Sequence, residues 1–134
     1  MGGPFHSLSI SGSGMDVYQT WLDAVADNIA NINNITATDE AAFRERVVVA
    51  RAREGGRPAG VTVDRLELGD AEGELFYQPN HPLADEEGFV RRPSVDLTQQ
   101  MTHMLVAQRA YQANLSAFRT AREAYQRALQ IGQR

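Results

Sequence analysis

Near both ends of the chain, apolar residues recur in steps of three and four, which places them along one side of an α-helix. The N-terminal row predicts a helix over residues 14–33, with Ser13 as its N-cap and the preceding Gly- and Ser-rich residues outside it. The C-terminal row predicts a longer helix that begins after Asp96, capped together with Gln99, and ends at Gly132. The N-terminal row consists of Met15, Tyr18, Leu22, Val25, Ile29 and Ile32. The C-terminal row consists of Leu97, Met101, Met104, Gln108, Tyr111, Leu115, Phe118, Arg122, Tyr125 and Leu129, in which Gln108 and Arg122 are the polar exceptions.

Alanines form a second row along the predicted C-terminal helix, beside the apolar row. Small side chains let another helix approach closely, and two adjacent rows make a face wider than one helical partner covers. We therefore expect this helix to contact helices of neighbouring subunits as well as the N-terminal helix. The second row consists of Ala107, Ala110, Ala117, Ala121, Ala124 and Ala128.

Between the two helices, residues 36–93 change to a strand-like pattern of β-branched and alternating residues. Glycines and a proline within residues 55–58 break this pattern once, and a slip in the alternation at Asp64 and Arg65 predicts a β-bulge. The segment therefore predicts a small antiparallel β module. Its expected strands are residues 43–52, 61–68, 74–78 and 88–92.

The charges are distributed unevenly along the 134 residues. Residues 1–35 carry three Asp and no cation, whereas residues 94–134 carry five Arg against two acids. Helices of opposite charge attract each other, so we expect them to pair within the chain or between copies. The predicted fold is mainly α, with the terminal helices paired as an antiparallel coiled coil. The expected domains are residues 1–35, 36–93 and 94–134, the second being β-rich.

Composition excludes several classes of function. The chain has no Cys, so disulfides, thiolate metal sites and cysteine nucleophiles are excluded. Its net charge of −4 argues against nucleic-acid binding, which requires surplus cations. No apolar run approaches the roughly 20 residues of a membrane span, and the first cation is Arg44, so we expect no cleavable signal peptide.

The histidines offer little basis for an active site. His81 lies near the acidic residues 85–87, but no second histidine has ligand spacing to it, which favours a solvated loop. His103 lies beside the predicted apolar row and is expected to be an ordinary helix residue. We therefore predict no catalytic residue, metal, cofactor or small-molecule substrate. Two alternatives stay open, a self-contained helical module that dimerises and a small hydrolase or metal enzyme that uses His81 or His103.

Three motifs resemble those of bacterial flagellar axial proteins. Ala26–Asn33 resembles their Asn-rich first helix, Tyr77–Asp85 with Gly88–Val90 and Pro93–Asp96 resembles the segment before the last helix of rod proteins, and Arg109–Asn114 resembles a motif of that helix. In this order the motifs resemble the flagellar basal-body rod protein family. The matching positions are Asn28, Asn31, Met101, Tyr111 and Asn114, and in the loop Tyr77, Pro79, His81, Pro82, Asp85, Gly88, Pro93 and Asp96.

This resemblance implies a structural subunit of a helical tube that crosses the periplasm and transmits torque from motor to hook. Paired terminal helices are then expected inside the tube and the middle region outside. The implied partners are other copies, other rod proteins, the adaptor between MS ring and rod, and the flagellar export apparatus, through which the chain leaves without signal cleavage. Two positions depart from the family pattern, because Gln100 replaces a usual Glu and Ala41–Ala42 replaces a Gly- or Pro-containing turn.

Overall fold

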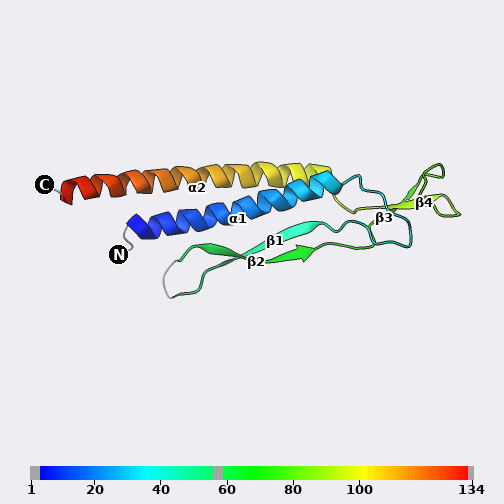
Figure 1. Ribbon diagram of the computed structural model, residues 1–134, viewed down its shortest axis with the longest axis horizontal. Coiled ribbons are helices and arrows are strands. Elements are labelled where there is room, and N and C mark those ends of the chain that lie inside the picture. Colours follow the sequence, from blue (N-terminus) through cyan, green and yellow to red (C-terminus); the bar gives the residue numbers. More distant parts are fainter. Residues whose placement is uncertain (1–3, 56–58, 133–134) are drawn as a thin grey trace. The chain divides into compact units, whose positions relative to one another are not determined.

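The computed structural model describes residues 4–55 and 59–132, and the predicted break at Gly56 and Pro58 lies outside them. In the sequence, one long helix precedes four strands and a second long helix follows them (Figure 1). The mainly helical architecture with a small antiparallel β region is therefore as predicted. The elements are α1 (Pro4–Asn31), β1 (Arg46–Ala52), β2 (Val61–Leu68), β3 (Glu74–Tyr77), β4 (Phe89–Arg92) and α2 (Leu97–Gly132).

Helix α1 begins at Pro4, ten residues before the predicted start, so the prediction of a non-helical segment before Gly14 was wrong. Ser13 is likewise not an N-cap but an interior residue, and its hydroxyl donates to the carbonyl of Ile10 at 2.7 Å. Proline is tolerated in the first turn because its missing N–H is not needed there. The low helix propensity of the Gly- and Ser-rich turns is overridden by tertiary packing, since Ser11, Ser13 and Gly14 are buried.

Helix α2 has the predicted start. The carboxylate of Asp96 accepts a hydrogen bond from the Gln99 N–H at 2.7 Å, which satisfies one free donor of the first turn. The helix then continues for 36 residues to Gly132. The Asp96 cap is thus confirmed.

Strands β1 and β2 form a two-stranded sheet of their own. The Arg53 N–H donates to the Gly60 carbonyl at 2.9 Å, and the Gly69 N–H donates to the Glu45 carbonyl at 2.8 Å. Between these two bonds the first strand advances by eight residues, from 45 to 53, but the second advances by nine, from 60 to 69. One extra residue therefore lies on the β2 side of the ladder, which agrees with the bulge predicted from the alternation.

Strands β3 and β4 form a second antiparallel sheet, in which Glu74 faces Arg92 and Tyr77 faces Phe89. On the other side of β4, Thr36 forms an isolated bridge with Arg91. The Arg91 guanidinium donates to the Thr38 carbonyl at 2.7 Å and also to the Glu72 carbonyl. One arginine thereby joins the segment after α1, the residue before Gly73 and β4.

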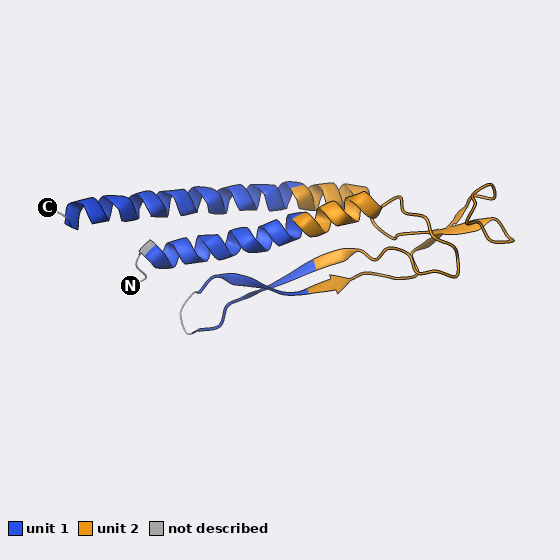
Figure 2. Cartoon of the chain, in the orientation of Figure 1, with its two compact units in different colours: residues 1–22, 48–65, 105–134 blue, residues 23–47, 66–104 orange. Residues whose placement is uncertain are grey.

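The chain divides into two compact units, each made of segments far apart in the sequence (Figure 2). Unit 1 has its buried apolar residues at Val17 and Ala107, and unit 2 at Ala24, Val25, Ala42 and Val90. Both cores therefore consist of small side chains. Unit 1 comprises Met1–Leu22, Val48–Arg65 and Leu105–Arg134, and unit 2 comprises Asp23–Val47 and Leu66–Met104.

Candidate helix-pairing site

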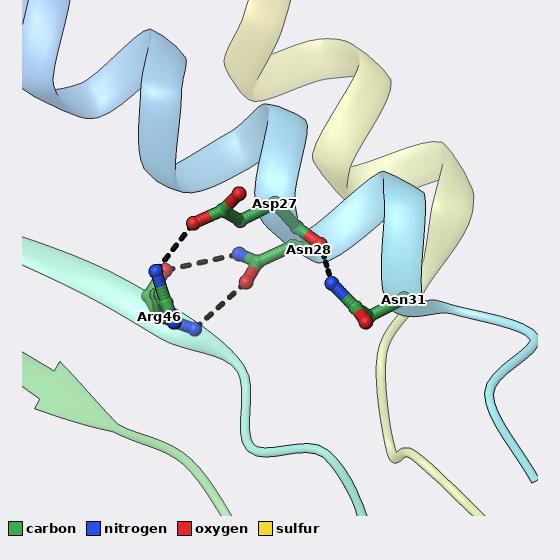
Figure 3. A network of polar contacts seen from close by, with 4 residues as sticks. All are labelled: Asp27, Asn28, Asn31 and Arg46. Carbon is green, nitrogen blue, oxygen red and sulfur yellow. Dashed lines mark hydrogen bonds and ion pairs between the residues drawn. The ribbon is translucent and has the colours of Figure 1, made fainter.

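In unit 2, Asn28 joins α1 to β1 through its side-chain amide (Figure 3). Its Nδ2 donates to the Arg46 carbonyl at 2.9 Å, and its Oδ1 accepts from the Arg46 N–H at 2.8 Å. The side chain therefore satisfies both backbone groups of Arg46, as a neighbouring strand would. Asn28 is 1% exposed, so these bonds are shielded from water.

The same amide also joins α1 to α2. The Nδ2 of Asn28 donates to the Oε1 of Gln100 at 3.0 Å, and the Nε2 of Gln100 donates to the Oε1 of Glu45 at 2.5 Å. Gln100 is fully buried, and the side-chain amide nitrogens and oxygens of Asn28 and Gln100 all have hydrogen-bond partners. Gln100 thus supplies a donor to a carboxylate. A second carboxylate there would face Glu45 with like charge.

Two further contacts beside Asn28 are more accessible to solvent. Asp27 forms an ion pair with the Arg46 guanidinium, and both side chains are about half exposed. The Nδ2 of Asn31 donates to the Asp27 carbonyl at 2.8 Å, one turn back in the helix (Figure 3). An exposed ion pair contributes little stability, so the buried amides rather than these charges hold this part of unit 2.

In unit 1, the contact between α1 and α2 depends on small and aromatic residues. A Cβ added at Gly14 would lie 2.7 Å from the Oδ1 of Asn114, so the α1 backbone closely approaches the α2 side chain. The rings of Phe5 and Tyr125 lie 4.5 Å apart between centroids. Moving from 5 to 14 on α1 corresponds to moving from 125 back to 114 on α2, so the two segments of unit 1 run antiparallel.

The face that α2 buries is shifted from the predicted row. Met104, Tyr111, Phe118 and Tyr125 belong to both rows and are half-buried. Between them, the observed row runs one residue earlier than the predicted one, through Ala107, Asn114 and Ala121 instead of Gln108, Leu115 and Arg122. At Asn114 this is where the backbone of α1 comes close, at Gly14. The observed row, in steps of four and three, is Gln100, Met104, Ala107, Tyr111, Asn114, Phe118, Ala121 and Tyr125.

The other predicted helix residues divide by exposure. Met101 and Leu129 are 56% and 48% exposed, so within the chain they lie outside the buried row. Val25 is buried, whereas Ile32 follows the last helical residue of α1. The remaining predicted positions are half-buried, namely Met15, Tyr18, Leu22, Ile29, Asn31, Asn114 and Leu115. Sequence analysis missed Ser13, Gly14, Glu45 and Gln100, although the unusual Gln100 was a signal.

The predicted loop motif forms the β3–β4 connection of unit 2. The Asp85 carboxylate accepts N–H groups from Glu87 at 3.0 Å and Phe89 at 2.8 Å, and Gly88 closes the turn with a φ of +86°. The backbone hydrogen bond from Phe89 is the main cause that lowers the pKa of Asp85 below its ordinary value. The Tyr77 and Phe89 rings stack edge to face, 5.3 Å apart.

The remaining loop positions have structural places as well. The Nδ1 of His81 accepts the Leu83 N–H at 3.1 Å, and Pro93 is buried before the Asp96 cap. Pro79 and Pro82 are exposed. Within residues 4–55 and 59–132 no group of His, Asp or Glu is placed to hold a metal ion. Over the same part of the chain, no helix is sufficiently long and apolar to span a bilayer.

Residues 86–131 match the family model described as flagellar basal body rod FlgEFG protein C-terminal. The flagellar basal-body rod protein FlgC of Yersinia enterocolitica is 35% identical over 94% of this chain and 96% of its own length. FlgC of Aquifex aeolicus is 36% identical over 94% and 95%, and FlgC of Bacillus subtilis 27% identical over 96% and 97%. The chain therefore belongs to the family of the flagellar basal-body rod protein FlgC.

Proposed function

We propose that this chain polymerises through its terminal helices into the bacterial flagellar rod and there transmits torque from motor to hook. As a member of the FlgC family it is a structural subunit of the flagellum and not an enzyme. The two alternatives from sequence, a dimerising module and an enzyme using His81 or His103, are correspondingly disfavoured.

The observation that carries this proposal is the exposed apolar surface of α2. Within unit 1, Leu105, Val106, Leu129 and Ile131 are each between 48% and 75% exposed. Covering one such side chain is worth roughly 1.5 to 3 kcal/mol, so a helix with several of them is stabilised by partners. In a rod, each subunit has neighbours on several sides, and these neighbours would cover the exposed apolar side chains of α2.

The proposal includes an antiparallel coiled coil between α1 and α2. The Phe5–Tyr125 and Gly14–Asn114 contacts of unit 1 support it, and so does the Asn28–Gln100 hydrogen bond within unit 2. We propose that the pairing and assembly residues are Met15, Tyr18, Leu22, Val25, Asn28, Ile29, Asn31, Ile32, Met101, Met104, Tyr111, Asn114, Leu115, Phe118, Tyr125 and Leu129.

We further propose that the loop motif from Tyr77 to Asp96 shapes the region before α2 rather than a ligand site. The division into domains 1–35, 36–93 and 94–134 remains part of this proposal. The expected partners are other copies, other rod proteins, the adaptor between MS ring and rod, and the export apparatus. The expected location is the basal body, where the rod crosses the periplasm, after export without a cleaved signal peptide.

The test is complementation of a flagellated bacterium whose own FlgC gene is deleted. The unsubstituted chain is expected to restore swimming and to appear in purified basal bodies. Leu115→Asp places a charge at a half-buried position of α2 and is expected to abolish both. Gln112→Asp, at an exposed position one turn away, is the matched control and is expected to leave both intact.

Two outcomes contradict the proposal. Absence of the unsubstituted chain from basal bodies, when it is expressed at normal levels, contradicts the role as a rod subunit. Full swimming with Leu115→Asp contradicts assembly through this part of α2, while leaving membership of the rod untouched.

A further inference from the structure

No contact within the described part of the chain explains why residue 12 of α1 is a glycine. A Cβ added at this position would meet no atom within 4 Å, whereas one at Gly14 would collide with Asn114. Glycine weakens a helix interior relative to alanine, because it loses more backbone freedom on folding. A Cβ at position 14 would therefore force the Asn114 side chain to move, whereas at position 12 the subunit alone would gain from a side chain.

Gly12 lies at the centre of an outward face of α1 in unit 1. The face consists of positions three and four residues apart, Ser9, Gly12 and Asp16, and both Ser9 and Asp16 are exposed. Most of these side chains are small, so another helix can approach the backbone closely. Asp16 gives the face a negative charge, and α1 contains no Arg.

Within the same unit, α2 presents an outward apolar face without a partner. Val106 and Ile131 are 49% and 75% exposed at its two ends. Exposed alanines occupy the same side of the helix between them. The alanines are Ala113, Ala117, Ala124 and Ala128.

The α2 face is bordered by cations. Arg109 and Arg127 lie at its edge by helical spacing, and among the described residues neither forms an ion pair. From Leu97 to Gly132 the helix has four Arg against one Glu. The face is therefore complementary in charge to an acidic helix and repels a basic one.

We propose that the Gly12 face of α1 packs against the alanine face of α2 in a second copy of this chain. Asp16 of one copy then lies near Arg109 or Arg127 of the other, and the missing side chain at Gly12 permits close contact between backbones. The occupant is a second copy because this chain itself carries both complementary faces. Since the two faces are different, each new copy leaves one of each free, and the contact propagates instead of closing as a dimer.

This inference rests on the proposed function, since it names the faces through which rod subunits would meet. The absence of Cys makes a cross-linking test clean. Gly12→Cys is co-expressed in the FlgC-deleted bacterium with a chain that carries Ala113→Cys, Ala117→Cys or Ala124→Cys, and basal bodies are oxidised. We expect a cross-linked pair for Gly12 with at least one of the three alanine positions. Ser7→Cys, on the opposite side of α1, is the control and is expected to give none.

Cross-links from Ser7 but not from Gly12, in basal bodies that contain the chains, would overturn the inference while leaving the rod role intact. Absence of even the unsubstituted chain from basal bodies would overturn the proposed function and this inference with it. A third outcome is that basal bodies incorporate the chain with Ser7→Cys but not the chain with Gly12→Cys. This outcome would support the inference, because it would show that assembly requires a position 12 without a side chain.

A second variant separates assembly from folding. Gly12→Leu is expected to keep or raise the thermal midpoint of the purified chain, because the position is open. Its incorporation into basal bodies is expected to fall by at least about tenfold, corresponding to one lost close contact. The incorporation of Ser7→Leu is expected to stay within about twofold of that of the unsubstituted chain, because no close contact is lost. Equal incorporation of the two variants would overturn the inference.

Discussion

Helix α1 is tied to the β1–β2 hairpin by a short polar side chain in each unit, but the two ties differ in kind. In unit 2, Asn28 satisfies both backbone groups of Arg46 and also binds Gln100. In unit 1, the Ser13 hydroxyl accepts one N–H, that of Val61, at 3.0 Å and donates within its own helix. Asn28 in unit 2 is therefore the centre of a branched network of hydrogen bonds, whereas Ser13 in unit 1 makes a single bond to β2 beside a close steric fit of α1 and α2.

This difference predicts how each unit responds to substitution. A buried network loses several partners when one member is removed, and each orphaned group keeps its desolvation cost. A close steric contact responds to side-chain volume instead, and it can be relieved when its neighbour is shortened. Four measurements test this contrast.

The largest effect is expected for Asn28→Leu. The substitution keeps the volume but leaves the Arg46 N–H, the Arg46 carbonyl and the Gln100 Oε1 without their amide partner. We expect the free energy of unfolding to fall by about 3 kcal/mol, measured by urea titration with circular dichroism. The control Asn31→Ala removes one half-buried bond within α1 and should cost less than about 1 kcal/mol. Similar losses for the two variants would contradict the network.

A smaller loss is expected for Ser13→Ala in unit 1. The variant leaves the Val61 N–H without its partner but disturbs no other strand group. We expect a loss of about 1 to 1.5 kcal/mol in the same titration. A loss as great as that of Asn28→Leu would show that the two ties are equivalent, contrary to the comparison above.

The steric character of unit 1 is tested by Gly14→Ala against Gly12→Ala. Both changes add helix propensity, but only the Cβ at position 14 meets Asn114, at 2.7 Å from its Oδ1. Gly12→Ala is expected to stabilise the isolated chain by about 0.5 to 1 kcal/mol. Gly14→Ala should fall below it, and the double variant Gly14→Ala with Asn114→Ala should recover part of the difference. No recovery in this cycle would argue against direct contact.

The smallest effect concerns pH and is confined to unit 2. Because hydrogen bonding lowers the folded-state pKa of Asp85, its carboxylate stabilises the β3–β4 turn above the ordinary aspartate pKa near 4. This stabilisation is lost as the pH falls through the folded-state pKa. Amide exchange at Phe89 is expected to accelerate there, and Asp85→Asn should remove the pH dependence. An unchanged pH profile in that variant would exclude Asp85 as the cause.

Local sequence signals predicted elements with a strong period or a specific cap. The Asp96 cap and the extra residue in β2 both follow from nearby residues. The resemblance to rod proteins drew attention to Asn28 and Asn114, although it did not reveal their partners. For Asn28, these partners lie 18 and 72 residues away in the sequence, so no local pattern contains them.

Two structural features depended on tertiary packing and were missed. The start of α1 was placed too late because Gly and Ser normally weaken a helix, whereas here Gly14 and Ser13 fit against α2 and β2. The buried row of α2 was shifted because hydrophobicity was used to choose it. Close helix approach instead selects the small Ala107 and the hydrogen-bonding Gln100, and leaves Met101 exposed.

The chain has one tryptophan, Trp21, and it lines an apolar cavity of about 240 Å³ in unit 1 together with Tyr18 and Val61. Its indole lies 6.0 Å from the Tyr18 ring. The single indole fluorophore of the chain therefore lies at the wall of this cavity. The emission wavelength reports how far water reaches the indole, and energy transfer from Tyr18 reports the separation of the two rings, so opening of this cavity can be followed without any dye or label.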